Sequence, residues 1–183
     1  MGRILVVGTS LTAGPGVAPE ATYPARLQEL IHEAGLAYRV INAGVSGETS
    51  AGALRRLDWL LREPADVVIV ETGANDMLRG LDPDSTRANL DAILRRLGQA
   101  NPAPVVLLVP MRALPNLGRP YGRRFEAIYP ELAARHGVRL LPFLLDDVAG
   151  QRAMNLPDGI HPNARGHERM ARNLWPGVRE VLE

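Results

Sequence analysis

Four polar residues near the ends of apolar runs have the types needed for chemistry on a carbonyl group. Ser10 and Asn75 each stand two residues after a glycine that ends such a run, and Asp158 and His161 lie in the segment LPDGIHPN. A serine hydroxyl becomes a nucleophile when a histidine removes its proton, and that histidine needs an acceptor on its other ring nitrogen. The residue types therefore predict acyl transfer by Ser10, provided that the fold brings the four together.

The spacing of Asp158 and His161 suits a joint role. They stand three positions apart, a spacing that a turn closes; Gly159 allows the bend, and Pro162 restricts His161 toward an extended backbone. The same pair could be half of a metal site, but no second cluster of histidines or carboxylates has ligand spacing. We therefore expect no metal and no cofactor.

Acyl transfer also needs hydrogen-bond donors for the oxyanion. The candidates are the backbone N–H groups of Ser10 and Gly44 and the side-chain amide of Asn75. Taken singly, each has a simpler interpretation: Ser10 as a helix cap, Gly44 as a strand end, and Asn75-Asp76 as a turn. Residue types alone leave both interpretations open.

The elements that must position these residues follow from the apolar pattern. Five short runs rich in valine, isoleucine and leucine do not alternate with polar residues, which is typical of strands buried on both faces of a parallel sheet. These runs cover residues 3–8, 38–44, 66–73, 104–110 and 138–143. Helical periodicity and end signals predict helices at 22–35, 50–63, 84–98, 122–137 and 163–183.

This alternation predicts an α/β fold, a three-layer α/β/α sandwich with a five-stranded parallel sheet, in one domain over residues 1–183. We expect Pro130 to disturb the fourth helix and Pro176-Gly177 to interrupt the last. Ligands of open parallel sheets bind beyond the carboxyl ends of the strands, where the candidate residues stand.

Composition excludes several classes of function. The formal net charge of +1 argues against a broad surface for nucleic acid, and the absence of cysteine removes disulfides, thiolate metal sites and cysteine nucleophiles. All 21 basic residues are arginines, so a lysine Schiff base or a Walker lysine is impossible. No window predicts a membrane span. We expect a cytoplasmic protein as written, or a periplasmic or secreted one if a leader was removed.

Four sequence blocks together resemble the SGNH (GDSL-type) hydrolase family, especially its thioesterase I, lysophospholipase and arylesterase branch. The blocks are VVGTSLTAG, NAGVSGETS, ETGANDMLRG and LPDGIHPNARGH, in that order. The resemblance implies a flavodoxin-like fold and a serine esterase of acyl esters or thioesters. It implies Ser10, Asp158 and His161 as the catalytic triad, with Ser10, Gly44 and Asn75 as the oxyanion hole.

One position departs from the family pattern. Thr9 stands where the Gly-Asp-Ser-Leu signature has its aspartate, which removes a carboxylate near the nucleophile but keeps a hydroxyl. A hydrolase fold with weakened activity that serves as a binding protein is therefore one alternative, and a carbohydrate-ester deacetylase of the same family is another. A nucleotide-binding module is disfavoured because GTSLTAGPG lacks both G-x-G-x-x-G and G-K-[ST].

The remaining expectations concern the substrate and the other charged side chains. The resemblance implies a small-molecule acyl substrate held by the apolar residues Met77, Leu78, Leu81 and Ile160, although ordinary loop packing is the simpler interpretation of each. We expect His32 and His136 to be structural residues at helix C-termini and His167 to be exposed on the last helix. Arg119, Arg123 and Arg124 should form a solvated face, or else meet an anionic acyl carrier.

Overall fold

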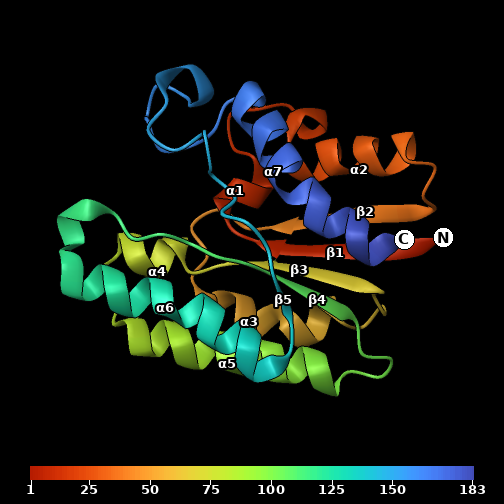
Figure 1. Ribbon diagram of the computed structural model, residues 1–183, viewed down its shortest axis with the longest axis horizontal. Coiled ribbons are helices and arrows are strands. Elements are labelled where there is room, and N and C mark those ends of the chain that lie inside the picture. Colours follow the sequence, from red (N-terminus) through yellow and green to blue (C-terminus); the bar gives the residue numbers. More distant parts are fainter.

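The core of the protein is a sheet of five parallel strands, and the computed structural model describes it within residues 1–183. The strand order is β2-β1-β3-β4-β5, which is the flavodoxin-like order (Figure 1). The strands are β1 (Gly2–Gly8), β2 (Tyr38–Gly44), β3 (Val67–Glu71), β4 (Val105–Val109) and β5 (Arg139–Leu140). All five predicted strands are present, and the predicted parallel sheet is confirmed.

The central strands are apolar because both of their faces are covered. Every residue of β3 is buried, and so are residues 4–8 of β1. β1 pairs along its whole length with β2, from Gly2 opposite Tyr38 to Gly8 opposite Gly44. This register places the end of β2 beside the turn that follows β1, where Ser10 stands.

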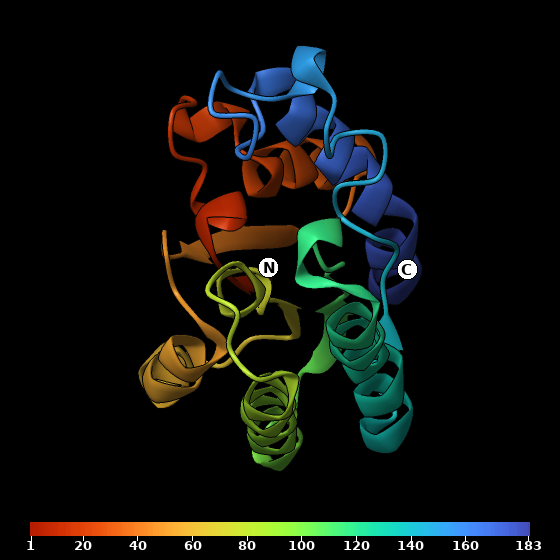
Figure 2. The same ribbon diagram turned by 90° about the vertical axis from the view of Figure 1, so that its left-hand side faces the viewer.

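Helices cover the two faces of the sheet. α2 (Tyr23–Glu33) and α7 (Ala164–Leu182) pack together on one face, whereas α3 (Ser50–Leu60), α5 (Pro83–Gln99) and α6 (Arg119–His136) cover the other (Figures 1 and 2). Two short helices, α1 (Ser10–Ala13) and α4 (Ala74–Leu78), lie at the carboxyl ends of β1 and β3. The predicted three-layer sandwich is therefore confirmed. None of the helices combines the length and the apolar composition needed to cross a membrane.

Two predictions about prolines are wrong. α6 continues through Pro130, and α7 continues through Pro176 without an interruption. A proline inside a helix costs about 3 kcal/mol, but burying one large apolar side chain contributes about 1.5–3 kcal/mol. In α7 the buried residues Leu174 and Val178 flank the proline, and in α6 Ile128 and Leu132 do so. Packing on both sides of each proline thus outweighs the lost hydrogen bond.

Candidate active site

Ser10, His161 and Asp158 meet at the carboxyl edge of the sheet. The Nε2 atom of His161 lies 3.2 Å from the Oγ of Ser10, although 151 positions separate the two residues. The Nδ1 atom of His161 lies 2.7 Å from Oδ2 of Asp158. The three groups form a continuous hydrogen-bonded chain, so a proton can pass from the serine hydroxyl to the imidazole.

The turn that carries the acid and the histidine is fixed by its own backbone. Oδ1 of Asp158 accepts hydrogen bonds from the N–H groups of Ile160 and His161, both at 2.9 Å. The N–H of Leu156 donates to the carbonyl of His161, which closes the loop. The predicted turn over D-x-x-H therefore forms, and it orients both side chains before any substrate binds.

The electrostatics of this turn keep the aspartate ionised. The hydrogen bond from His161 and the backbone N–H groups of His161 and Ile160 lower the pKa of Asp158 to about 2. Asp158 is therefore a carboxylate at neutral pH, as an acceptor for the Nδ1–H of His161 must be. This acceptor fixes the tautomer that leaves Nε2 free to take a proton from Ser10.

The nucleophile candidate stands on the first residue of a very short helix. Thr9 is the N-cap of α1, and its hydroxyl accepts a hydrogen bond from the N–H of Leu11. Gly14 ends the helix in a left-handed conformation, with its N–H donating to the carbonyl of Ser10. The N–H of Ser10 belongs to the first turn and has no partner in the protein, so it is available as a donor.

The expected oxyanion donor Gly44 is not free. Its N–H donates to Oδ1 of Asn42 at 2.9 Å, and a Cβ at this position would lie 2.3 Å from the backbone N of Ala13. Gly44 is therefore a glycine because β2 packs closely against α1, and we correct its assignment as a donor. Three residues later, Gly47 has an N–H without a partner in the protein. The same block thus holds a second glycine whose donor is available.

Asn75 lies against the segment that contains Gly47. Its Nδ2 donates one hydrogen to the carbonyl of Glu48 at 2.9 Å, which leaves the second amide hydrogen without a partner. Glu48 in turn forms a two-point ion pair with Arg56, both bonds at 2.7 Å, and Arg56 also donates to the carbonyl of Ala43. The ion pair ties the loop to β2 and α3, and sequence reasoning missed it because its two residues stand eight positions apart without a motif.

Asp76, the neighbour of Asn75, has a structural role. It is buried, and its carboxylate accepts hydrogen bonds from the N–H and hydroxyl of Ser50 and from the hydroxyl of Thr86. These bonds connect α4 to the start of α3 and to α5. Asp76 therefore holds the short helix that presents Asn75.

The predicted substrate-binding residues separate into two groups. Met77 is only 5% exposed and belongs to the main apolar core, so its assignment to an open pocket wall is wrong. Leu78, Leu81 and Ile160 are exposed; Leu78 is the last residue of α4, whereas Leu81 and Ile160 lie on loops at the carboxyl edge of the sheet. The hydroxyl of Tyr121 donates to the carbonyl of Leu81 and braces the loop that follows α4.

The other histidines include one further correction. His32 and His136 stand in the last turns of α2 and α6 as expected, and His136 contacts Asp91 at 2.9 Å. His167 was expected to be exposed but is buried, with its Nδ1 accepting a hydrogen bond from the N–H of Tyr23. Burial lowers the pKa of His167 to about 4, so it is neutral. His167 stands three positions before the buried Met170 on the same helix, and this spacing could have indicated that His167 is buried.

The arginines expected to form a solvated face are exposed. Arg119, Arg123 and Arg124 all belong to α6, and Arg124 forms ion pairs with Asp82 at 2.8 Å and Asp84 at 3.0 Å. This part of the prediction is confirmed.

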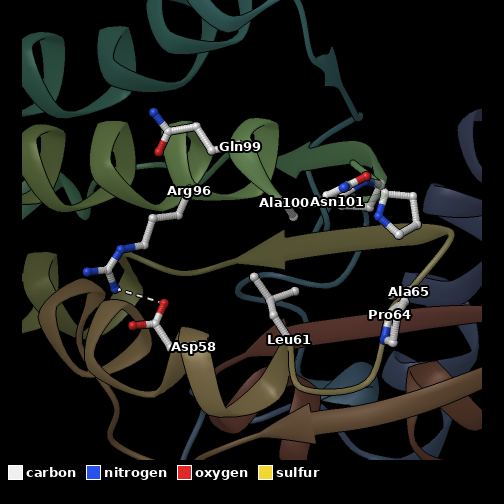
Figure 3. Close-up of a pocket in the computed structure, with 10 residues that line it drawn as sticks. Asp58, Leu61, Pro64, Ala65, Arg96, Gln99, Ala100 and Asn101 are labelled. Carbon is white, nitrogen blue, oxygen red and sulfur yellow. Dashed lines mark ion pairs between the residues drawn. The ribbon is translucent and has the colours of Figure 1, made fainter.

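A separate hollow lies at the opposite end of the sheet. It has a volume of about 310 Å³ and is lined by the segments that precede β3 and β4, including Pro64, Ala65 and Asn101, with an ion pair between Asp58 and Arg96 at its side (Figure 3). Ligands of parallel sheets bind at the carboxyl ends of the strands. This hollow lies at the amino ends, so it is not the site that contains Ser10.

Known proteins resemble this chain over nearly its whole length. Residues 6–169 match the GDSL-like Lipase/Acylhydrolase family. Esterase TesA of Pseudomonas aeruginosa is 39% identical over 181 residues, which cover 98% of this chain and 89% of that protein. Thioesterase 1/protease 1/lysophospholipase L1 of Escherichia coli is 39% identical over 180 residues, covering 96% and 84% of the two chains. A crystal structure of TesA aligns with a TM-score of 0.92 at 37% identity, covering 98% and 99%.

Proposed function

Since the chain belongs to the GDSL-like lipase/acylhydrolase family and is an ester-hydrolysing enzyme, we propose that Ser10, His161 and Asp158 form its catalytic triad and that its substrates carry apolar acyl groups. The observation that supports the triad most strongly is the 3.2 Å approach of Ser10 Oγ to His161 Nε2. No other pair of serine and histidine side chains in the protein is hydrogen-bonded.

In the proposed first step, Oγ of Ser10 attacks the carbonyl carbon of the ester while Nε2 of His161 takes the hydroxyl proton. The carbonyl double bond opens and places a negative charge on its oxygen. Asp158 accepts the Nδ1–H of His161 and stabilises the imidazolium that forms. The tetrahedral intermediate then expels the alcohol or thiol, which receives the proton from His161, and an acyl-serine remains.

We assign the oxyanion to three donors that have no other partner. They are the N–H of Ser10, the N–H of Gly47 and the second amide hydrogen of Asn75. In this assignment Gly47 replaces Gly44, whose N–H already donates to Asn42. Water then repeats the sequence: His161 takes its proton, the hydroxyl attacks the acyl carbon, and Ser10 leaves with the proton returned.

The distribution of exposed apolar side chains supports an apolar acyl group. Five of the nine large apolar residues that are exposed stand on segments that follow the carboxyl ends of strands, four of them on loops and Leu78 at the end of α4. They are Val45, Leu78, Leu81, Leu114 and Ile160. Exposed apolar side chains that gather around a polar site are typical of ligand-binding surfaces.

The replacement Ser10→Ala tests the triad. Hydrolysis of p-nitrophenyl butyrate should fall on the order of 10⁶-fold, as it does when a serine nucleophile is removed elsewhere. The variant should also lose labelling by a fluorophosphonate while keeping its melting temperature. Ser46→Ala, at an exposed serine in the neighbouring loop, is the matched control and should retain the parent rate. Retained turnover by Ser10→Ala would refute the assignment.

The acyl preference needs its own measurement. We expect kcat/KM for p-nitrophenyl esters to rise from acetate to octanoate, because longer chains bury more apolar surface. Leu78→Ser should lower the rate with octanoate more than the rate with acetate. A preference for acetate that Leu78→Ser leaves unchanged would instead favour the carbohydrate-ester deacetylase.

A further inference from the structure

A buried carboxylate lies directly behind the turn that carries Ser10. Glu71, the last residue of β3, is 0% exposed. Its Oε2 accepts hydrogen bonds from the N–H of Thr9 at 2.8 Å and from the hydroxyl of Thr12 at 2.8 Å. Its Oε1 accepts one from the hydroxyl of Thr9 at 3.0 Å. One side chain thus fixes the residues on both sides of Ser10.

The turn is shaped to admit this carboxylate. A Cβ on Gly8 would lie 1.9 Å from Oγ1 of Thr12 and 2.7 Å from Oε2 of Glu71. The Gly8 position therefore needs a glycine for the turn to close over the carboxylate. The hydroxyl of Thr12 also contacts the hydroxyl of Tyr23 at 2.7 Å, which extends the network to α2.

The hydroxyl of Thr9 has two functions that an aspartate could not combine. It accepts the N–H of Leu11 as a helix cap, and it donates its hydrogen to Glu71. An ionised aspartate accepts hydrogen bonds and has no hydrogen to donate. With the signature aspartate at this position, two carboxylates would face each other, and such a pair must share a proton or repel.

We propose that Glu71 is a positioning residue for the nucleophile, and that Thr9 is the hydrogen-bond donor that allows Glu71 to hold the Ser10 turn without a proton shared between two carboxylates. The inference rests on the proposed role of Ser10. It assigns Thr9 as part of a matched donor and acceptor pair in which Glu71 is the acceptor. It does not require Glu71 to touch the substrate.

The surroundings of Glu71 agree with this role. Burial raises the pKa of Glu71 to about 7, whereas the hydrogen bonds from Thr9 and Thr12 lower it and the charge of Glu48 raises it. The titratable and charged groups that surround this network are Tyr23 on α2, Tyr129 on α6, and the ion pair between Glu48 and Arg56. No cation contacts the carboxylate, so hydroxyl and N–H donors carry its stabilisation.

The test exchanges donor and acceptor at the two positions. In Thr9→Asp both side chains are acceptors, so the turn should lose its geometry once the shared proton dissociates. We expect kcat/KM of this variant to fall at least 10-fold between pH 7 and pH 9, with the parent flat over that range. The double variant Thr9→Asp/Glu71→Gln has an acceptor at 9 and an amide donor at 71, and it should recover the flat profile.

The readout is hydrolysis of p-nitrophenyl butyrate, with the uncatalysed rate subtracted at each pH. Thr49→Asp, which adds a carboxylate at the N-cap of α3, controls for charge near the site and should follow the parent. A Thr9→Asp profile parallel to that of the parent, or a double variant no flatter than Thr9→Asp, would overturn the proposal. Mapping the fluorophosphonate label to Ser10 by mass spectrometry tests the nucleophile separately.

A second pair of variants keeps the proposal falsifiable if Thr9→Asp does not fold. Thr9→Ser retains the hydroxyl and should keep kcat within 2-fold. Thr9→Val removes the hydroxyl, and with it both the donor to Glu71 and the cap of α1, and should lower kcat about 10-fold with KM unchanged, since a displaced catalytic group reduces kcat by up to about 10²-fold. Equal kcat for the serine and valine variants would contradict the role of the hydroxyl.

Discussion

Replacing Glu71 by glutamine should change how the stability of the protein depends on pH. The pKa of Glu71 is about 7 in the folded protein, compared with an ordinary value of 4.5. The folded protein therefore keeps this proton to a higher pH than the unfolded chain does. Stability of the parent is lost as pH rises from about 4.5 to about 7, because folding must then bury a charge. Glutamine has the same size and does not titrate.

The size of the effect follows from the two pKa values. A difference of about 2.5 between them corresponds to about 3 kcal/mol, of which about 2.5 kcal/mol falls between pH 5 and pH 8. His167 works in the opposite direction, since its pKa is about 4 instead of 6.5 and stability is lost as pH falls below about 6.5. The two contributions largely cancel in the parent, so its own pH profile would conceal both.

The free energy of unfolding should therefore be measured as a difference between Glu71→Gln and the parent. Urea unfolding followed by circular dichroism at pH 5, 6, 7 and 8 gives this difference, in which the contribution of His167 cancels. We expect it to move in favour of the variant by about 2.5 kcal/mol from pH 5 to pH 8. Glu20→Gln, at an exposed carboxylate without an ion pair, should give a constant difference. A constant difference for Glu71→Gln would refute the reasoning.

Three further predictions concern the site and its support. Asn75→Ala should lower kcat about 10²–10³-fold in steady-state assays, because one oxyanion donor is lost; a change below 3-fold would remove Asn75 from the oxyanion hole. Asp158→Asn should lower kcat about 10⁴-fold by disturbing the tautomer of His161, and a loss under 10-fold would contradict its role as the triad acid. Asp76→Ala should reduce the free energy of unfolding by about 3 kcal/mol in urea titrations, because it leaves the buried N–H and hydroxyl of Ser50 without their acceptor; an unchanged midpoint would refute this.

The fold and the proposed triad could be predicted because their signals are local. Buried parallel strands are continuous apolar runs, and the five runs correspond to the five observed strands. The turn over Asp158 and His161 depends on residues three positions apart. Since the carboxyl ends of parallel strands share one edge, the sequence also indicated that Ser10 would lie near this turn.

Spacing could not decide which of two nearby glycines offers its N–H. Gly44 and Gly47 belong to one block, and the choice depends on where each N–H points. The N–H of Gly44 donates to the amide oxygen of Asn42, whereas the N–H of Gly47 has no acceptor in the protein. Similarly, Met77 has a residue type that is common in pocket walls, but its side chain is packed in the apolar core.

The sequence by itself determined the order of strands and helices and the residues that we propose for acyl transfer, because these depend on neighbours along the chain. Only the tertiary structure decided that His167 is buried and neutral, and that Thr9 donates to a carboxylate 62 positions away. Burial and hydrogen-bond partners arise from segments distant in sequence, and they set both the pKa of a side chain and whether its donors are free. The environment of the nucleophile is therefore a property of the packed sheet and not of the signature block alone.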